Sequence, residues 1–329
     1  MLKDIPVFTI SLDFELYWGI FDRMPLEKKV QYFENTRQVI PEMLSHFERE
    51  KVHVTWATVG MLFAENWDDW TAHKPEQIPT YEKPQLSSYR LKDLYAGKPE
   101  FNSCLFAPAL VEQVKNTPYQ EMATHTFSHY YCREEGQTVA QFRSDLQAAK
   151  RIAARKGIEL RSMVFPRNQL NEAYLKVCHE EGLATVRSNP VDWFWDMDVK
   201  ERLIKRAFRS ADAYIPIGAR TSYKLSALEL QEGLPLALPA SRLLRPLHLK
   251  YKFLNRLRLK RVLGEMTAAA KSKECYHLWW HPHNFGDSPR QSLQDLVVIL
   301  NHFTTLKEKY GMASMSMLGI YDHIKNKKA

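Results

Sequence analysis

The sequence lacks several features that would assign a protein to a membrane or to a secreted class. No window approaches the roughly 18 uninterrupted apolar residues of a membrane-spanning helix, and the first 16 residues contain no long apolar segment with a small-residue cleavage site. The four cysteines are scattered without C-x-x-C spacing, so neither a disulfide framework nor a cysteine zinc site is indicated. We therefore expect a cytoplasmic protein with reduced cysteines.

Positive charge is in modest excess and is unevenly distributed. The net charge is +8 at pH 7, and much of it lies in residues 241–266, where Lys and Arg alternate with Leu, Phe and Tyr at near-helical spacing. A basic helical stretch at about 241–271 can contact an anionic membrane or hold an anionic substrate, or it can be a solvated helix with its leucines in the core. The rest of the chain shows no nucleic-acid recognition motif, so we expect no nucleic-acid partner.

The pattern along the 329 residues predicts a single α/β domain spanning 1–329. At least six short β-like runs are each followed by a helical run, which favours a mostly parallel sheet, open or closed into a barrel. The expected strands lie at about 6–16, 52–62, 121–126, 161–168, 183–188, 274–285 and 312–317. Residues 64–106 interrupt this alternation as a long insertion, which we expect to cover or shape a functional site.

Polar side chains follow several of these expected strands. In both open and closed parallel sheets the active site lies at the carboxyl ends of the strands. The residues placed there are Asp13, Glu15, His125, His129, Pro166, Arg167, His281 and His283. We expect these groups to converge at one end of the sheet.

The histidine pair and the two early acids suggest a metal site. Neutral imidazoles and one carboxylate suit a borderline cation such as Zn²⁺, which can keep an open position for water. His125 and His129 can reach one ion if the segment between them turns helically, and Asp13 and Glu15 point to the same side of a regular strand. Hydrolysis at such a site also requires a base and an acid, for which Asp13 and His281 are the candidates.

Four short segments, taken in order, resemble the motifs of the polysaccharide deacetylase family, carbohydrate esterase family 4. They read SLDFEL, THTFSH, VFPRN and LWWHPHNF, and they span nearly the whole chain. The resemblance implies a distorted (β/α) barrel of mostly parallel strands, with seven as the expected number. Two departures from the family pattern are the D-F-E spacing of the acids and the Pro-Arg order in the third motif.

The resemblance also implies a role for each residue. Glu15, His125 and His129 would hold a divalent metal, expected to be Zn²⁺ (zinc). Asp13 would be the base, Arg167 its orienting partner, and His281 the acid, with His283 as the alternative. The residues assigned to substrate binding are Trp18, Pro166, Asn168, Trp280 and His283.

The expected activity is removal of an N-acetyl group from a sugar. Without an export signal, the expected substrate is made inside the cell: a free or nucleotide-linked precursor, or a lipid-linked intermediate of bacterial surface polysaccharide such as lipopolysaccharide O-antigen. Peripheral contact with the inner membrane would follow from the basic stretch. Two alternatives are an allantoinase-type amidohydrolase acting on a small cyclic amide and a glycan-binding barrel without activity.

Overall fold

The computed structural model describes residues 4–190, 192–195 and 203–328. Its strands form one sheet in the order β6-β5-β4-β3-β2-β1-β8-β7, with β9 added beside the start of β1, and all paired strands are parallel. The strands are β1 (Val7–Phe14), β2 (Val54–Thr58), β3 (Gln120–Thr124), β4 (Ser162–Val164), β5 (Thr185–Ser188), β6 (Leu236–Pro239), β7 (Arg242–Leu243), β8 (Cys275–Trp280) and β9 (Ala313–Ser314).

One chain segment closes this sheet into a barrel. The strands β6 and β7 follow each other directly, and β6 pairs with β5 whereas β7 pairs with β8 at the opposite edge. The change of partner occurs between Ala240, whose N–H donates to Ser188 O, and Ser241, whose N–H donates to His277 O. With residues 236–243 counted as one strand and β9 left aside, the described residues form a barrel of seven parallel strands, and the predicted fold class is confirmed.

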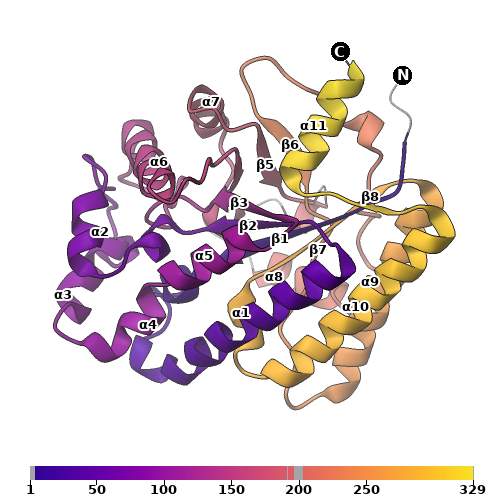
Figure 1. The fold of residues 1–329 in the computed structure, drawn as a ribbon, viewed down its shortest axis with the longest axis horizontal. Coiled ribbons are helices and arrows are strands. Elements are labelled where there is room, and N and C mark those ends of the chain that lie inside the picture. Colours follow the sequence, from indigo (N-terminus) through magenta and orange to yellow (C-terminus); the bar gives the residue numbers. More distant parts are fainter. Residues whose placement is uncertain (1–3, 191, 196–202, 329) are drawn as a thin grey trace.

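The helices surround the barrel, and α1, α10 and α9 lie next to one another on one side (Figure 1). Helix α11 packs against the opening at the amino ends of the strands, where Met317 and Ile320 join Val7 and Cys275 in one apolar cluster. The helices are α1 (Val30–Glu50), α2 (Trp67–His73), α3 (Leu91–Tyr95), α4 (Asn102–Leu105), α5 (Pro108–Asn116), α6 (Val139–Ala154), α7 (Glu172–Glu180), α8 (Leu203–Asp212), α9 (Lys252–Ser272), α10 (Pro289–Tyr310) and α11 (Met317–Lys328). No helix in the described part of the chain has both the length and the apolar character needed to cross a membrane.

The alternation of side chains along β1 delivers an acid to the barrel interior. Every residue of β1 is buried, but successive side chains of a strand point to opposite faces. Phe8, Ile10 and Phe14 belong to the apolar core beneath the helices, whereas Ser11 and Asp13 hydrogen-bond to an arginine inside the barrel. The strand therefore carries Asp13 to its carboxyl end on the inner face.

The insertion at 64–106 forms the short helices α2, α3 and α4 between β2 and α5. It reaches the segment that follows β3, because Ser88 Oγ donates to Ser128 O over 2.9 Å and Tyr81 Oη accepts from the Tyr131 N–H over 2.8 Å. The basic stretch is helical only from Lys252, since Arg242–Leu243 pair with β8 and residues 244–251 form a loop. Pro246 lies within this loop, and because proline has no backbone N–H to donate to a helical hydrogen bond, it disfavours a helix through this segment.

Candidate active site

The two histidines lie on a tight turn after β3, not on a helix. Thr126 and His129 adopt left-handed backbone conformations with φ of 64° and 58°, and such conformations are uncommon outside glycine. The hydroxyl of Thr126 accepts a hydrogen bond from the Tyr130 N–H over 2.7 Å, which closes the turn. The imidazole ring centres of His125 and His129 are consequently only 5.1 Å apart.

A buried acid from α6 holds this turn in place. Asp145 Oδ1 accepts from the N–H groups of Phe127 and Ser128 over 2.7 and 3.3 Å, and its second oxygen accepts from the Ser128 hydroxyl. Burial raises the pKa of Asp145 to about 6, although the three donors favour its charged form. Asp145 was not among the predicted residues; its only signal in the sequence is an acid on the buried face of an amphipathic helix.

Glu15, His125 and His129 converge into one buried group. Glu15 Oε2 lies 3.3 Å from His125 Nε2 and 3.1 Å from His129 Nε2, and one ligand atom from each residue lies within 4.8 Å of the others. The carboxylate and the two imidazoles thus meet as the sequence interpretation requires. Burial opposes ionisation of Glu15, but the surrounding histidines, His281 first, hold the pKa of its carboxyl well below the usual value.

The outer nitrogen atoms of the two imidazoles are also engaged. His125 Nδ1 lies 2.8 Å from Val164 O; because a carbonyl only accepts, Nδ1 donates this hydrogen bond, and Nε2 is the nitrogen that faces Glu15. His129 Nδ1 faces the Tyr131 hydroxyl at 3.1 Å. Burial lowers the pKa of His129 to about 4, so its imidazole is neutral at pH 7. Two oriented imidazoles and one carboxylate are a donor set that fits a divalent cation.

Asp13 is paired with an arginine that the sequence analysis missed. Arg187 on β5 donates from its two terminal nitrogens to the two oxygens of Asp13 over 2.6 and 2.8 Å. Both side chains are almost completely buried. Burial opposes ionisation of Asp13, but the Arg187 charge and the nearby histidines outweigh it, so the pKa of this carboxyl lies below its usual value.

The predicted pairing of Arg167 with Asp13 is therefore wrong. Arg167 forms ion pairs with Asp22 and Glu134, and its guanidinium carbon lies 4.0 Å from the ring centre of Tyr131. Left-handed backbone at Arg167 and Asn168 turns the chain sharply after β4. Asn168 then accepts from Arg187 over 2.9 Å, while Arg167 is placed near the histidine pair instead.

The two late histidines differ in accessibility. The side chain of His281 is 26% exposed, and its Nε2 lies 3.6 Å from both Asp13 Oδ2 and Glu15 Oε1. His283 is enclosed, with its ring packed beside Tyr32 and Phe33, and burial lowers its pKa to about 3. His281 is thus the one of the pair that substrate can reach, and the assignment of His283 to substrate contact is not supported.

Three other predicted substrate contacts are contradicted by burial. Trp18 and Trp280 have no exposed surface and belong to the apolar core, and Pro166 is buried as well. Trp280 points outward to the helices because it follows Trp279 by one residue on β8. Trp279 instead points inward, with its ring 4.2 Å from the Arg187 guanidinium carbon. Of the residues predicted to bind substrate, Asn168 is partly exposed and lies next to the Asp13–Arg187 ion pair.

Comparisons with known proteins bear on the fold. No family model matches the sequence, and no curated protein sequence is significantly similar to it. A Mycobacterium smegmatis protein whose given name assigns it to the polysaccharide deacetylases is 12% identical over 99% of this chain and 92% of its own, with a TM-score of 0.61. The chain has the polysaccharide deacetylase fold.

Two further solved structures show how widely this fold is used. A Pseudomonas aeruginosa PAO1 protein, also assigned by name to the polysaccharide deacetylases, matches with 9% identity, coverage of 98% and 90%, and a TM-score of 0.54. The PuuE allantoinase matches with 10% identity, coverage of 96% and 88%, and the same TM-score of 0.54. Because both enzyme classes have this fold, the side chains of the site must decide between the reactions.

Proposed function

We propose that the protein is a metal-dependent hydrolase that removes an N-acetyl group from a sugar. The observation that carries this proposal is the buried group of Glu15, His125 and His129 beside the Asp13–Arg187 pair. When bound to these three residues, a divalent cation, Zn²⁺ by preference, would lower the pKa of a water molecule and polarise the acetyl carbonyl. The base and the acid that hydrolysis also requires are side chains that lie beside Glu15, His125 and His129.

Asp13 is suited to act as the base. Its two oxygens are fixed by Arg187, so the carboxylate cannot rotate away, and its low pKa keeps it ionised at neutral pH. In the proposed reaction Asp13 takes a proton from the attacking water, whose oxygen forms a bond to the acetyl carbon. The part that Arg187 plays is positioning, since it contacts the base and not the reacting atoms.

His281 is suited to act as the acid. It lies beside both carboxylates and is the more accessible of the two late histidines. As the C–N bond breaks, a proton from His281 passes to the nitrogen, which leaves as the sugar amine while the acyl part leaves as acetate. The inward-facing Trp279, whose Nε1 has no partner among the described residues, offers an apolar face and a donor beside this position.

The substrate is proposed to be an acetylated sugar made inside the cell, either free, nucleotide-linked or lipid-linked, in bacterial surface-polysaccharide synthesis such as that of lipopolysaccharide O-antigen. Cytoplasmic location is part of the same proposal. The allantoinase-type alternative uses the same fold; what favours deacetylation is the complete metal-ligand set, which a metal-free amidohydrolase would not require. A glycan-binding barrel would not require the Asp13–Arg187 pair either.

The test compares three proteins for metal content and for acetate release from N-acetylated sugars. Wild type should hold about one equivalent of divalent metal and release acetate. Asp13→Asn should keep the metal and lose turnover by on the order of a hundredfold or more, whereas His125→Ala combined with His129→Ala should lose both. A metal-free wild type, or an Asp13→Asn protein with an unchanged rate, would refute the proposed mechanism.

A further inference from the structure

Two segments of the chain carry a dense excess of positive charge. Residues 241–264 contain eight Lys or Arg residues and no Asp or Glu, and residues 203–211 contain three and none. Some of these cations serve the fold: Arg242 pairs with Asp212 and Glu265, and Arg258 pairs with Asp295. Others are exposed, among them Lys250, Lys252 and Arg256, and none of these three has an acidic partner in the described part of the chain.

Large apolar side chains alternate with these exposed cations. Leu249, Tyr251 and Phe253 are 64%, 52% and 60% exposed, and each is separated from the next by one lysine. On α8, Leu203 and Ile204 are 79% and 55% exposed. Single exposed apolar residues are ordinary, but a contiguous group of them marks an interaction site.

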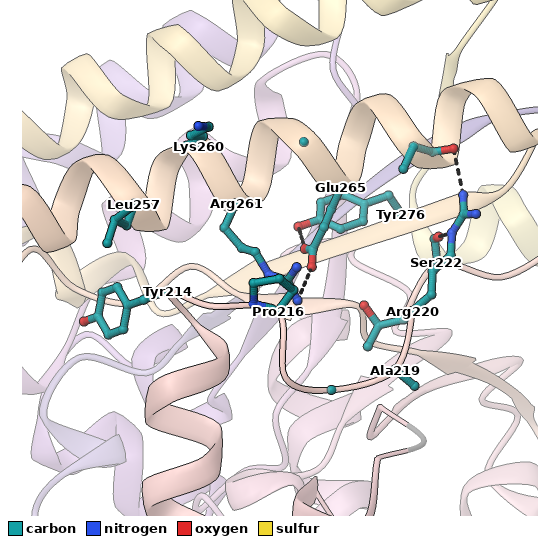
Figure 2. Close-up of a pocket in the computed structure, with 14 residues that line it drawn as sticks. Tyr214, Pro216, Ala219, Arg220, Ser222, Leu257, Lys260, Arg261, Glu265 and Tyr276 are labelled. Atoms are coloured by element: carbon teal, nitrogen blue, oxygen red, sulfur yellow. Dashed lines mark hydrogen bonds and ion pairs between the residues drawn. The ribbon is translucent and has the colours of Figure 1, made fainter.

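The two segments form one surface. Phe208 of α8 packs on Trp193 with ring centres 5.1 Å apart, and the carbonyl of Arg209 accepts from Arg245 in the loop before α9 over 2.8 Å. We call the exposed part of residues 193–194, 203–209 and 245–260 the rim surface. It continues into a groove of about 600 Å³ between α9 and residues 214–222, at which Leu257 and Tyr214 face each other (Figure 2).

The rim surface adjoins the opening of the candidate active site. α8 follows the carboxyl end of β5 and the 244–251 loop follows the carboxyl end of β7, the same end at which Asp13 and His281 lie. A chain of contacts connects the two regions. The guanidinium carbon of Arg209 lies 5.4 Å from the ring centre of Trp195, the ring centres of Trp195 and Trp279 are 6.4 Å apart, and the Arg187 guanidinium lies over Trp279. A partner bound to the rim surface would therefore lie next to the carboxyl ends of the strands, where the candidate active site opens.

We propose that the rim surface docks on a lipid bilayer that contains anionic lipids. Exposed lysines and arginines attract an anionic headgroup layer, and interleaved Leu, Ile and Phe side chains bury in the acyl boundary beneath it. A nucleic acid or other polyanion would use the cations but would leave these aliphatic side chains in water. Binding of the rim surface to a bilayer does not depend on the proposed deacetylation.

The test is sedimentation of the full-length protein with vesicles of phosphatidylcholine alone or with one third phosphatidylglycerol. We expect binding to the anionic vesicles only, weakened by salt. Neutralising Lys250, Lys252 and Arg256 together (K250Q, K252Q, R256Q) should weaken binding at least tenfold. Leu249→Ser with Phe253→Ser should weaken it comparably while leaving the net charge unchanged.

A matched control removes the same charge elsewhere. Lys271, Lys307 and Lys309 are exposed lysines at the far ends of α9 and α10, so K271Q, K307Q, K309Q should bind as wild type does. Circular dichroism and thermal unfolding of each variant exclude misfolding as the cause of a loss. Equal binding by both triple variants, binding that is insensitive to the Leu249 and Phe253 changes, or capture by heparin or DNA but not by vesicles would each overturn the proposal.

Discussion

Substitution of one glycine tests the proposed metal site without replacing any of its three ligands. A methyl group added at Gly19 would lie 1.9 Å from Glu15 Oε1, whereas real Cβ atoms are not found closer than 3.0 Å to such atoms. In Gly19→Ala the carboxylate must therefore retreat by at least 1.1 Å. Metal–oxygen bonds tolerate displacements of only about 0.2 Å, so Glu15 would no longer be a ligand in its present position.

The expected result separates binding from folding. The atoms that must move, Oε1, Cδ and Cγ, all belong to the side chain of Glu15, and Gly19 has no positive φ, so Gly19→Ala should still fold, which thermal unfolding checks. Its affinity for Zn²⁺, measured by competition with a chromophoric chelator, should fall by more than about 100-fold, because loss of a ligand exceeds the usual cost of outer-shell changes. Gly264→Ala is the control, since no described atom lies within 4 Å of its added methyl group. Wild-type affinity in a folded Gly19→Ala protein would refute the assignment of Glu15.

Two further substitutions test the supports of the base and of the histidine turn. In Arg187→Lys the charge stays but the two-pronged contact to Asp13 is lost, so the pKa of Asp13 should rise and the acid limb of the pH profile of kcat/KM should move to higher pH. Arg167→Lys is the control and should leave that limb in place. An equal shift in both variants would contradict the assignment of Arg187 as the partner of the base. Asp145 has a folded-state pKa of about 6 against a usual 3.8, so its contribution to stability is fully present below about pH 4 and is lost as pH rises through 6. Urea titrations give the free energy of unfolding of wild type and of Asp145→Asn. The difference, wild type minus variant, should fall by up to about 3 kcal/mol between pH 4 and pH 7. A difference that stays constant over this range would show that the pKa of Asp145 is not raised in the folded state.

Much of the barrel could be predicted from the sequence because its strands are apolar runs that are each followed by an amphipathic helix. The expected strands near 6–16, 52–62 and 183–188 contain β1, β2 and β5. The closing segment 236–243 was missed, since its two strands are short, contain Pro239 and owe their structure to two different partners. A segment that joins the two edges of a sheet changes its pairing partner part-way, so it shows no continuous alternation of apolar and polar residues by which a strand could be recognised.

For the site, the sequence by itself determined the residue types that local order brings to one place. Asp13 and Glu15 lie two residues apart at a strand end, and His125 and His129 share one short turn, so their proximity needs few long-range contacts. Only the tertiary structure decided which arginine holds Asp13, which of two adjacent tryptophans faces the barrel, and which late histidine is open to substrate. Those answers depend on the register between strands far apart in sequence and on burial, because a shift of one residue moves every side chain to the other face of the sheet.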